Sequence, residues 1–320
     1  MYLPVTLVVP ILNEIESLPD LLQALKAQTH RPSEIIFSDA GSTDGSADLI
    51  KAWWNKERWH GAKCSVLSLP GAMPGAGRNA GIRAASNNWI AFIDGGIVPA
   101  IDWLEQVSRC AIQKNVSAVF GVCHFSASTP FSKAICALSY GHGSQHAVIP
   151  ASLFKREVFD TVGEFIPSLR AGEDLIWMAS FYSCYGEREV CTNAQVSYVH
   201  FPNSWQHAFS KWYITELNCS LAGIKNLHHM IYLLGLPLIY LGVFSGGYYG
   251  AIGLLFYLLL RGVYDPFRRS KDSPWWGQQP RAALIAIPMA AMLDLAKWSG
   301  ILRGVSHRCI LNVVRLRRQK

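Results

Sequence analysis

The sequence predicts an α/β protein with a mainly parallel β-sheet, followed by a C-terminal helical region associated with a membrane. Over the first hundred residues, short β-branched runs alternate with stretches of helical spacing, a pattern typical of βαβ units. Further along, residues 231–260 carry no formal charge, and basic residues follow them. We therefore expect an α/β domain at residues 1–228 and a membrane-associated helical region with a basic tail at residues 229–320.

Acidic residues follow the predicted strands of the first domain. The strands are expected at residues 5–9, 34–38, 65–69 and 89–93, and the helices at residues 14–28, 46–56 and 78–86. Glu14, Asp39 and Asp94 each come shortly after a strand. Because such sheets bind ligands at the carboxyl ends of their strands, these acids predict a ligand site at that edge.

The composition indicates contact with a membrane. Half of the residues are hydrophobic and 16% are charged, against roughly 25% charged residues in ordinary soluble domains. Residues 1–228 hold 17 Lys and Arg against 19 Asp and Glu, whereas residues 229–320 hold 12 against 3. A basic tail suits nucleic acid or an anionic membrane surface. The apolar stretches between its basic clusters favour the membrane, so we expect no nucleic-acid partner.

The apolar stretch 231–260 is long for one membrane-spanning helix, which needs about 20 residues, and short for two. Gly246-Gly247 near its middle predicts a hairpin tip or a kink. A second apolar segment, 282–302, contains Asp294 and Lys297, whose spacing lets them pair on one helix face. Two complete spans would place the intervening basic loop outside, although basic residues tend to stay cytoplasmic. We therefore expect a short re-entrant hairpin and an interfacial helix.

The cysteines and the N-terminus indicate a reducing compartment. Eight cysteines are scattered along the chain without a Cys-x-x-Cys pair, whereas disulfide scaffolds are usually short and cysteine-dense. Residues 1–5 lack the basic leader of a signal peptide, and Glu14 and Glu16 soon follow the first apolar run. We therefore expect free thiols and a first domain on the cytoplasmic side of the membrane.

Four motifs of the first domain resemble those of family 2 glycosyltransferases, which have the GT-A fold with a Rossmann-like sheet. They are Val8-Val9-Pro10-Ile11-Leu12-Asn13-Glu14, the turn at residues 37–46, Gly77-Arg78-Asn79-Ala80-Gly81 followed by Ile93-Asp94, and Gly172-Glu173-Asp174. They stand in the family's order and at its usual spacing, within residues 3–215. The resemblance implies inverting transfer of a sugar from a nucleotide diphosphate sugar to an acceptor hydroxyl.

The resemblance also implies which residues bind the donor: Pro10, Glu14, Asp39, Arg78 and Asp94. Asp39 can accept a hydrogen bond from a nucleobase ring N–H. The alternative role for Asp39 is to cap a turn or a helix, and this structural role is the preferred one for Asp44 and Ser46. Arg78 is expected to meet phosphate, with a surface salt bridge as the alternative. The glycine-rich segment 71–79 follows the third strand and not the first, so dinucleotide binding is not expected.

A divalent metal is the expected cofactor. Asp94-Gly95-Gly96 stands where the family usually has Asp-x-Asp, which binds the cation through hard carboxylate oxygens. Because Gly96 replaces the second aspartate, we expect Asp94 to hold Mg²⁺ or Mn²⁺ weakly. His200 resembles a later family position that completes the coordination, although a lone histidine is as readily structural. A positive side chain such as Lys211 is expected to replace part of the metal's charge.

Asp174 is implied as the catalytic base that takes the proton from the acceptor hydroxyl. The structural alternative is that Glu173 and Asp174 begin a helix, where the dipole favours acids. Glu173 is expected to orient the base or to contact the acceptor. Lys211 and Trp212 lie in a segment that loosely resembles a motif of processive members. Its Gln and Arg are missing, which favours a single transfer. Trp212 either stacks on the acceptor or anchors the membrane interface.

These observations predict an inverting glycosyltransferase that acts on a lipid-linked or membrane-proximal glycan acceptor, in cell-envelope or exopolysaccharide synthesis. A membrane-tethered site meets lipid substrates at a high local concentration. The alternative is a non-catalytic, degenerate glycosyltransferase-like membrane scaffold. Gly96 favours that alternative, and the retained acids at the other motif positions oppose it. A nucleotidyltransferase is least favoured, because no Gly-rich loop with Arg and Lys follows the first strand.

Overall fold

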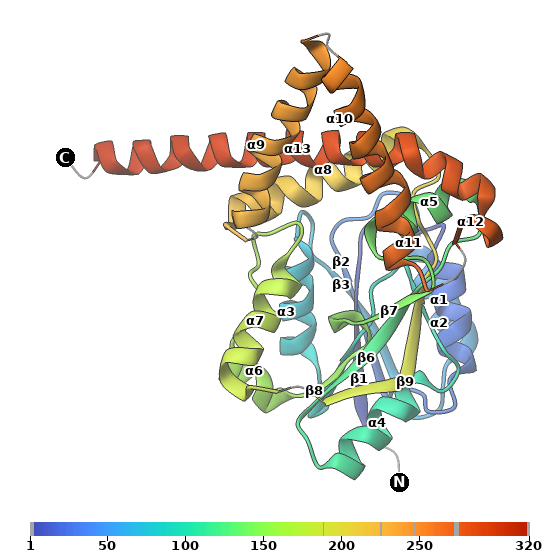
Figure 1. Cartoon of the computed structure of the whole chain (residues 1–320). Helices are drawn as coiled ribbons and strands as arrows, with labels where there is room; N and C mark the ends of the chain where they lie inside the picture. The colour runs from blue at the N-terminus through green and yellow to red at the C-terminus, as the bar shows by residue number, and fades with distance from the viewer. Residues whose placement is uncertain (1–2, 188, 225, 246–247, 272–274, 319–320) are drawn as a thin grey trace. The chain divides into compact units, whose positions relative to one another are not determined.

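A computed structural model describes residues 3–187, 189–224, 226–245, 248–271 and 275–318 (Figure 1). The chain divides into two units by the contacts within each. The first unit comprises Met1–Phe125, Gln145–Leu169 and Glu173–His200. The second unit comprises Ser126–Ser144, Arg170–Gly172 and Phe201–Lys320.

The first unit is built on one mixed β-sheet. Within the described residues the sheet has nine strands, in the order β3-β2-β1-β4-β8-β6-β9-β5, with β7 beside β6. They are β1 (Val5–Ile11), β2 (Glu34–Asp39), β3 (Lys63–Ser68), β4 (Trp89–Phe92), β5 (Ile97–Pro99), β6 (Ala118–Phe125), β7 (Ser144–Ala147), β8 (Leu153–Lys155) and β9 (Glu189–Tyr198). Strands β1 to β4 pair in parallel, whereas β8 runs antiparallel to β4 and β6. The predicted α/β fold with parallel βαβ units is confirmed.

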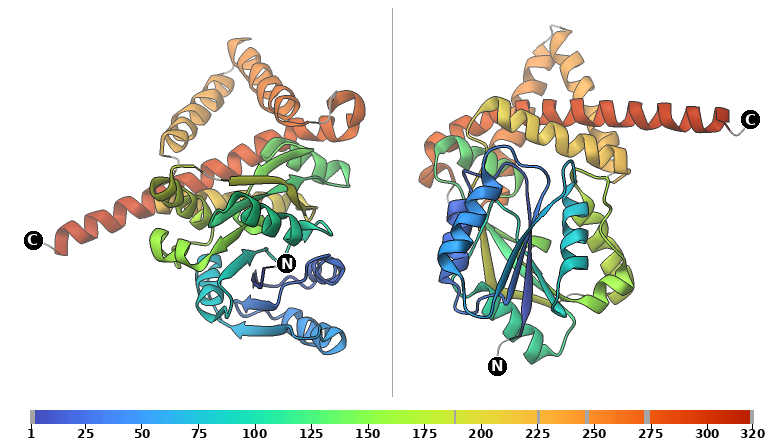
Figure 2. Two further views of the ribbon diagram at one scale, coloured as in Figure 1. Left: turned by 90° about the horizontal axis from the view of Figure 1, so that it is seen from below. Right: turned by 180° about the vertical axis from the view of Figure 1, so that it is seen from behind.

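Helices cover both faces of the sheet (Figures 1 and 2). One face carries α1 (Leu18–Ala27) and α2 (Ser46–Glu57), and the other carries α3 (Pro74–Ala84), α6 (Arg156–Val162) and α7 (Glu173–Tyr185). Helix α4 (Trp103–Lys114) packs against β6 and β9, and a short 3₁₀ turn, η1 (Ile149–Ala151), precedes β8. Strands covered on both faces become apolar along their length, which explains the buried runs of β1 and β2.

Aromatic rings form the core that positions α7 against the sheet. Phe154 of β8 and Trp177 of α7 are at most 2% exposed, and their ring centroids lie 5.2 Å apart. Phe165, in the segment before α7, stacks on Trp177 at 5.0 Å. Burying aromatic rings of this size contributes much of the stability of a core. The N-terminal end of α7 is therefore held by packing on the sheet.

Two helices begin at other residues than the sequence predicted. Helix α1 begins at Leu18 and not at Glu14, because the backbone N–H groups of residues 13–15 donate to side chains of the β2–α2 loop. Helix α3 begins at Pro74 and not at Arg78, since proline is well suited to the first helical turn. Arg78 therefore lies inside a helix and not at its start.

The second unit is helical. Its elements are α5 (Pro130–Ser139), α8 (Trp205–Ala222), α9 (Asn226–Phe244), α10 (Tyr248–Leu259), η2 (Leu260–Tyr264), α11 (Asp265–Arg269), α12 (Trp275–Gln278) and α13 (Pro280–Arg318). Helix α13 packs along α8, where Gly300 and Gly304 allow close approach: a β-carbon on Gly304 would stand 2.6 Å from Ser220 Cβ. Small residues at this contact let the two backbones pack tightly.

Two helices of the second unit, Tyr248–Arg269 and Pro280–Arg308, are long and apolar enough to cross a membrane. The expected pair of Asp294 and Lys297 is present, with 3.9 Å between Lys297 Nζ and Asp294 Oδ1. Gly246-Gly247, the predicted hairpin tip or kink, lies outside the described residues, as do the side chains of the basic tail from residue 309 onward. Seven cysteines in the described part of the chain are free thiols.

Candidate active site

The loop after β1 is held in place by the loop after β2. The Glu14 N–H donates to Ser46 Oγ and the Ile15 N–H donates to Asp44 Oδ2, each at 2.9 Å. Asp44 Oδ1 in turn accepts from the Ser46 hydroxyl at 2.6 Å. Asp44 and Ser46 therefore have the structural role preferred for them from the sequence. They fix the backbone that carries Glu14 at the carboxyl end of β1.

The Glu14 carboxylate lies against the Asp94-Gly95-Gly96 turn. A β-carbon on Gly95 would stand 2.9 Å from Glu14 Cγ, and one on Gly96 would stand 3.8 Å from Glu14 Oε2. The Ser17 hydroxyl donates to Glu14 Oε2 at 2.5 Å. Burial raises the pKa of Glu14, the hydrogen bond from Ser17 opposes this, and the charge of Asp94 adds to it. The two glycines thus make room for a second carboxylate beside Asp94.

Asp39 ends β2, opposite Ile11 in the parallel register. One of its oxygens, Oδ1, accepts from the Ser42 N–H at 2.8 Å, the Ser42 hydroxyl at 2.7 Å and the Gly41 N–H at 3.2 Å. The turn-capping role considered from the sequence is therefore present. No described residue donates to its other oxygen, Oδ2. The two roles are compatible, because the turn orients the carboxylate and one oxygen remains for a nucleobase.

Arg78 joins two of the predicted site carboxylates from inside α3. The side chain is 4% exposed; Nη1 lies 2.5 Å from Glu173 Oε1 and Nη2 lies 2.7 Å from Asp94 Oδ1. Burial by itself would lower the pKa of the guanidinium, but the charges of Asp94, Glu173 and Asp174 raise it overall. Arg78 Nε is buried and has no acceptor among the described residues. The guanidinium is thus a permanent buried cation. It pairs with Asp94, which follows β4, and with Glu173, which begins α7.

Glu173 and Asp174 begin α7 but differ in environment. Glu173 is 4% exposed, and burial raises the pKa of its carboxyl while Arg78 lowers it. Asp174 is partly exposed, and its Oδ1 accepts from the Leu175 N–H at 2.8 Å. Among the described residues Asp174 has no ion-pair partner within 4.0 Å, whereas Glu173 is paired with Arg78. The carboxylate of Asp174 is therefore the one that remains available to a ligand.

Asn79 is a positioning residue to which the sequence analysis assigned no role. Its Nδ2 donates to the Phe165 carbonyl at 2.8 Å, and its Oδ1 accepts from the Phe165 N–H at 2.9 Å. The pair ties α3 to the segment that leads into α7. The signal in the sequence was its place next to Arg78, since adjacent helical residues can hold two parts of one site.

His200 is near the acidic residues but does not complete a metal cluster. Its Nε2 lies 3.6 Å from Asp20 Oδ2, outside hydrogen-bonding range, and its interaction with Glu14 partly opposes the rise in the pKa of Glu14 that burial causes. No group of three or more His, Cys, Asp or Glu residues in the described part of the chain has the arrangement of a metal site. Asp94 and Glu14 nevertheless fit a cation such as Mg²⁺, which is commonly bound by one or two carboxylates together with substrate phosphates.

The remaining predicted residues lie elsewhere. Pro10, within β1, packs near Gly77 of α3, where an added β-carbon would stand 3.5 Å from Pro10 Cβ. Lys211 and Trp212 belong to α8 of the second unit. Trp212 is 7% exposed, and Lys211 Nζ lies 5.6 Å from the centroid of its ring. Their assignment to the acceptor remains a prediction.

Comparison with known proteins identifies the class of this chain. The family model described as Glycosyl transferase family 2 matches residues 6–171, just over half of the chain. The chain therefore belongs to glycosyl transferase family 2.

Relatives and a solved structure agree with this membership. Glycosyltransferase AglE of Haloferax volcanii is 27% identical over 189 residues, which are 54% of this chain and 59% of that protein. The putative teichuronic acid biosynthesis glycosyltransferase TuaG of Bacillus subtilis is 24% identical over 237 residues, covering 71% of this chain and 90% of that protein. A mannosyltransferase from Pyrobaculum calidifontis, solved with GDP-Man and Mn²⁺, has a TM-score of 0.57 at 16% identity and covers 92% of this chain and 88% of its own. The predicted GT-A fold is confirmed.

Proposed function

We propose that this glycosyltransferase moves a sugar, with inversion, from a nucleotide diphosphate sugar to a lipid-linked or membrane-proximal acceptor in cell-envelope or surface-polysaccharide synthesis. The observation that carries the proposal is the Arg78 bridge, which brings Asp94 and the Glu173-Asp174 pair to the same edge of the sheet as Glu14. The name of the Bacillus subtilis relative supports the polysaccharide class. The apolar helices of the second unit support an acceptor at a membrane.

The donor would lie along the carboxyl ends of β1, β2 and β4. Asp39 Oδ2 would accept from the nucleobase, while its Oδ1 stays engaged in the turn. Pro10 and Glu14 would line the same stretch. Asp94 and Glu14 would hold Mg²⁺ or Mn²⁺ together with the diphosphate. When bound, the cation supplies positive charge against the diphosphate oxygens. Arg78 would contribute a second positive charge, even though its Nη atoms are engaged by carboxylates.

Asp174 would act as the general base. The acceptor oxygen forms its bond to the anomeric carbon as the bond from that carbon to the diphosphate breaks, and the hydroxyl proton passes to the Asp174 carboxylate. Glu173 is the weaker candidate because Arg78 engages its Oε1 and its side chain is buried away from an incoming acceptor. Attack on the face opposite the leaving diphosphate inverts the configuration. Glu173 would instead orient the start of α7.

The base assignment is tested by Asp174→Asn, with Asp160→Asn as the matched control on an exposed position of α6. We expect Asp174→Asn to lower kcat by about 100- to 10,000-fold, because the amide cannot accept the proton, with donor KM nearly unchanged. Steady-state transfer from UDP- and GDP-sugars to a lipid phosphate acceptor measures both constants. The control is expected to keep full activity. Full activity in Asp174→Asn, with native circular dichroism, would show that another group is the base.

Gly96 is the observation that favours a non-catalytic scaffold as the second candidate. Calorimetry of the full chain with UDP- and GDP-sugars, with and without Mn²⁺, separates the two. A transferase binds at least one donor, and a scaffold need bind none. We further propose that the catalytic unit lies on the cytoplasmic side, where nucleotide sugars are made, and that Lys211 and Trp212 contact the acceptor.

A further inference from the structure

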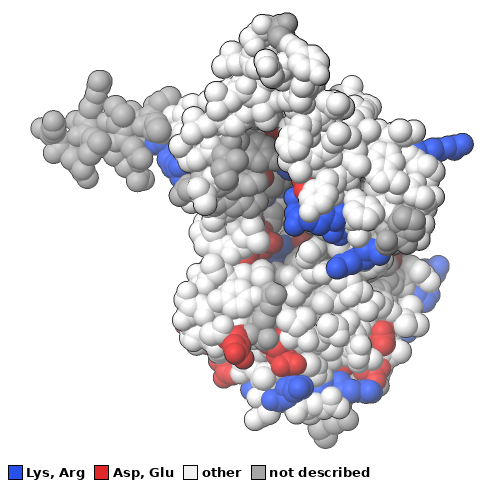
Figure 3. All heavy atoms as spheres, in the orientation of Figure 1, with Lys and Arg blue, Asp and Glu red and all other residues white. Residues whose placement is uncertain are grey.

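The α9–α10 segment presents a wide apolar surface to solvent. Leu238, Leu241, Phe244, Tyr249 and Phe256 are between 65% and 86% exposed. Residues 231–260 contain no charged side chain. In Figure 3 the upper end of this segment is white apart from atoms that are not described. Soluble proteins rarely expose a contiguous apolar surface of this kind unless it meets a partner or a membrane.

The two helices converge as a hairpin. Gly250 at the start of α10 lies against the end of α9, where an added β-carbon would stand 3.0 Å from Val243 Cα. Helix α10 has 12 residues, which correspond to about 18 Å of helix. The hydrocarbon core of a bilayer is about 30 Å thick. The helix continues through η2 and α11 to Arg269, but its uncharged part, from Tyr248 to Leu260, is therefore shorter than this core.

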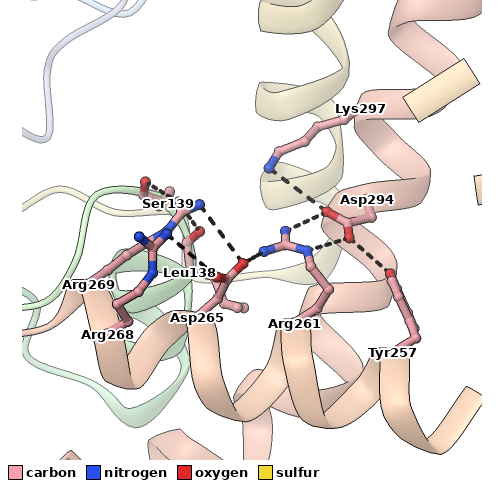
Figure 4. A network of polar contacts seen from close by, with 9 residues as sticks. All are labelled: Leu138, Ser139, Tyr257, Arg261, Asp265, Arg268, Arg269, Asp294 and Lys297. Atoms are coloured by element: carbon pink, nitrogen blue, oxygen red, sulfur yellow. Dashed lines mark hydrogen bonds and ion pairs between the residues drawn. The ribbon is translucent and has the colours of Figure 1, made fainter. Parts of the chain in front are cut away.

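A polar network marks where the apolar part of the hairpin ends. Arg261 Nε and Nη2 bind the two oxygens of Asp294 at 2.8 and 2.7 Å, and Arg261 also pairs with Asp265 (Figure 4). The Tyr257 hydroxyl donates to Asp294 Oδ2 at 2.9 Å. Just beyond, Arg269 donates to the carbonyls of residues 138 and 139 in α5. The second half of the run Tyr248–Arg269 thus contacts protein through charged groups, which are costly to place in hydrocarbon.

Helix α13 buries one face against the second unit, while other positions such as Leu284 are exposed. Ala283, Ala286, Ala290 and Ala296 are all fully buried. Its partner helix α8 carries Lys211 and Glu216, and Glu216 Oε2 lies 3.1 Å from His229 Nε2. Drawing α13 across a bilayer would pull α8 into hydrocarbon with it. Burying the charges of α8 there would be unfavourable.

We infer that α9 and α10 form a hairpin that enters the membrane from one face and returns to that face, with the Arg261–Asp294 network at the polar boundary. The occupant of the apolar surface is lipid, because charged residues follow the hairpin at its base and none lies along its arms. The hairpin anchors the chain without placing any helix fully across the bilayer. The inference concerns attachment alone and does not depend on the sugar transferred.

Attachment is tested with the full chain and vesicles of phosphatidylcholine and phosphatidylglycerol in equal parts, at high salt. The triple variant Leu238→Asp, Leu241→Asp and Phe256→Asp is expected to lower vesicle partitioning by at least about 100-fold. Ile101→Asp is the matched control, since Ile101 is 60% exposed on the first unit. Unchanged partitioning of the triple variant overturns the inference. So does a wild-type chain that stays off vesicles and forms a dimer through this surface.

The depth of insertion into the membrane is tested with two cysteine variants. Ser245→Cys lies at an exposed position directly after α9, and Ser183→Cys lies at an exposed position on α7. The protein is added to sealed vesicles, and an impermeant maleimide is supplied either outside or trapped within. The wild-type chain gives the background from native thiols. Residue 183 is expected to react from outside, and residue 245 from neither side. Reaction of residue 245 with the trapped reagent would show a crossing and overturn the inference, and reaction from outside would show that the hairpin does not insert.

Discussion

Arg78 joins carboxylates that are distant in the sequence, 16 residues away at Asp94 and 95 residues away at Glu173. A buried guanidinium needs such partners, because an unpaired charge in this position would be strongly destabilising. Its two ion pairs leave Asp174 as the acid without an ion pair at the start of α7. The difference in environment between Glu173 and Asp174 is therefore set by a residue on another helix.

Substitution of Gly96 tests the proposed weak metal site. A β-carbon at this position has no neighbour closer than Glu14 Oε2 at 3.8 Å, so the first side-chain carbon introduced by Gly96→Asp has room. The added carboxylate is expected to raise the affinity for Mn²⁺, measured calorimetrically with bound UDP or GDP, by about tenfold, because it supplies another hard oxygen ligand. Asp94→Asn is expected to abolish Mn²⁺ binding. If Gly96→Asp gains nothing, the cation is held elsewhere.

At the scale of elements, the contact between α3 and β1 decides where Arg78 points. Gly81 of α3 lies directly over Val8 of β1, and an added β-carbon would stand 2.9 Å from Val8 Cγ2. The close approach lets the helix lie flat on the sheet. It directs Arg78 toward Glu173 at the start of α7 and Asn79 toward Phe165 in the segment that leads into α7.

Gly81→Ala is therefore expected to destabilise the protein, even though alanine favours helix more than glycine does. Overpacking against β1 should lower the free energy of unfolding by about 1–3 kcal/mol. Urea denaturation in detergent followed by circular dichroism measures it. Gly253→Ala in α10, where nothing lies within 4 Å of the added carbon, is the control and is expected to be neutral or stabilising. Equal effects at both positions would mean that the α3–β1 contact is looser than described.

At the scale of the whole molecule, charge is divided along the chain. Residues 1–228 have a net charge of −2, and residues 229–320 have +9. Arg268, whose side chain is 59% exposed, and Lys271, also exposed, follow the hairpin. Basic residues at this position attract the headgroups of anionic lipids, at about 1 kcal/mol each near the surface.

The double variant Arg268→Gln and Lys271→Gln is expected to bind anionic vesicles about tenfold less tightly than the wild-type chain at low salt. At high salt, which screens the attraction between basic residues and lipid headgroups, the two chains are expected to bind nearly equally. Sedimentation with phosphatidylglycerol vesicles measures the binding. Lys51→Gln with Arg83→Gln, at positions 61% and 60% exposed on the first unit, forms the control. If the control loses vesicle binding to the same extent, the effect comes from the net charge of the chain and not from Arg268 and Lys271.

Much of the fold was predictable because local pattern decides it. Runs of β-branched residues in the sequence predict the buried strands, and the acidic residues that follow these runs indicate the carboxyl edge of the sheet. The family motifs then indicated which acids matter. Helical spacing alone did not show the starts of α1 and α3. The start of α1 depends on side chains of a distant loop that accept backbone N–H groups, whereas Pro74 was a local signal for the start of α3 that the helical spacing did not use.

By itself, the sequence determined the class of fold, the family and the separation of a near-neutral part from a basic, apolar one, since these properties are carried by composition and by short motifs. Only the tertiary structure decided that Glu14 lies beside Gly96, that Arg78 engages Glu173 and leaves Asp174, and that α13 is packed while α9 and α10 are exposed. Each of these depends on contacts between residues far apart in the chain, and local pattern carries no record of which distant side chains will share a buried space.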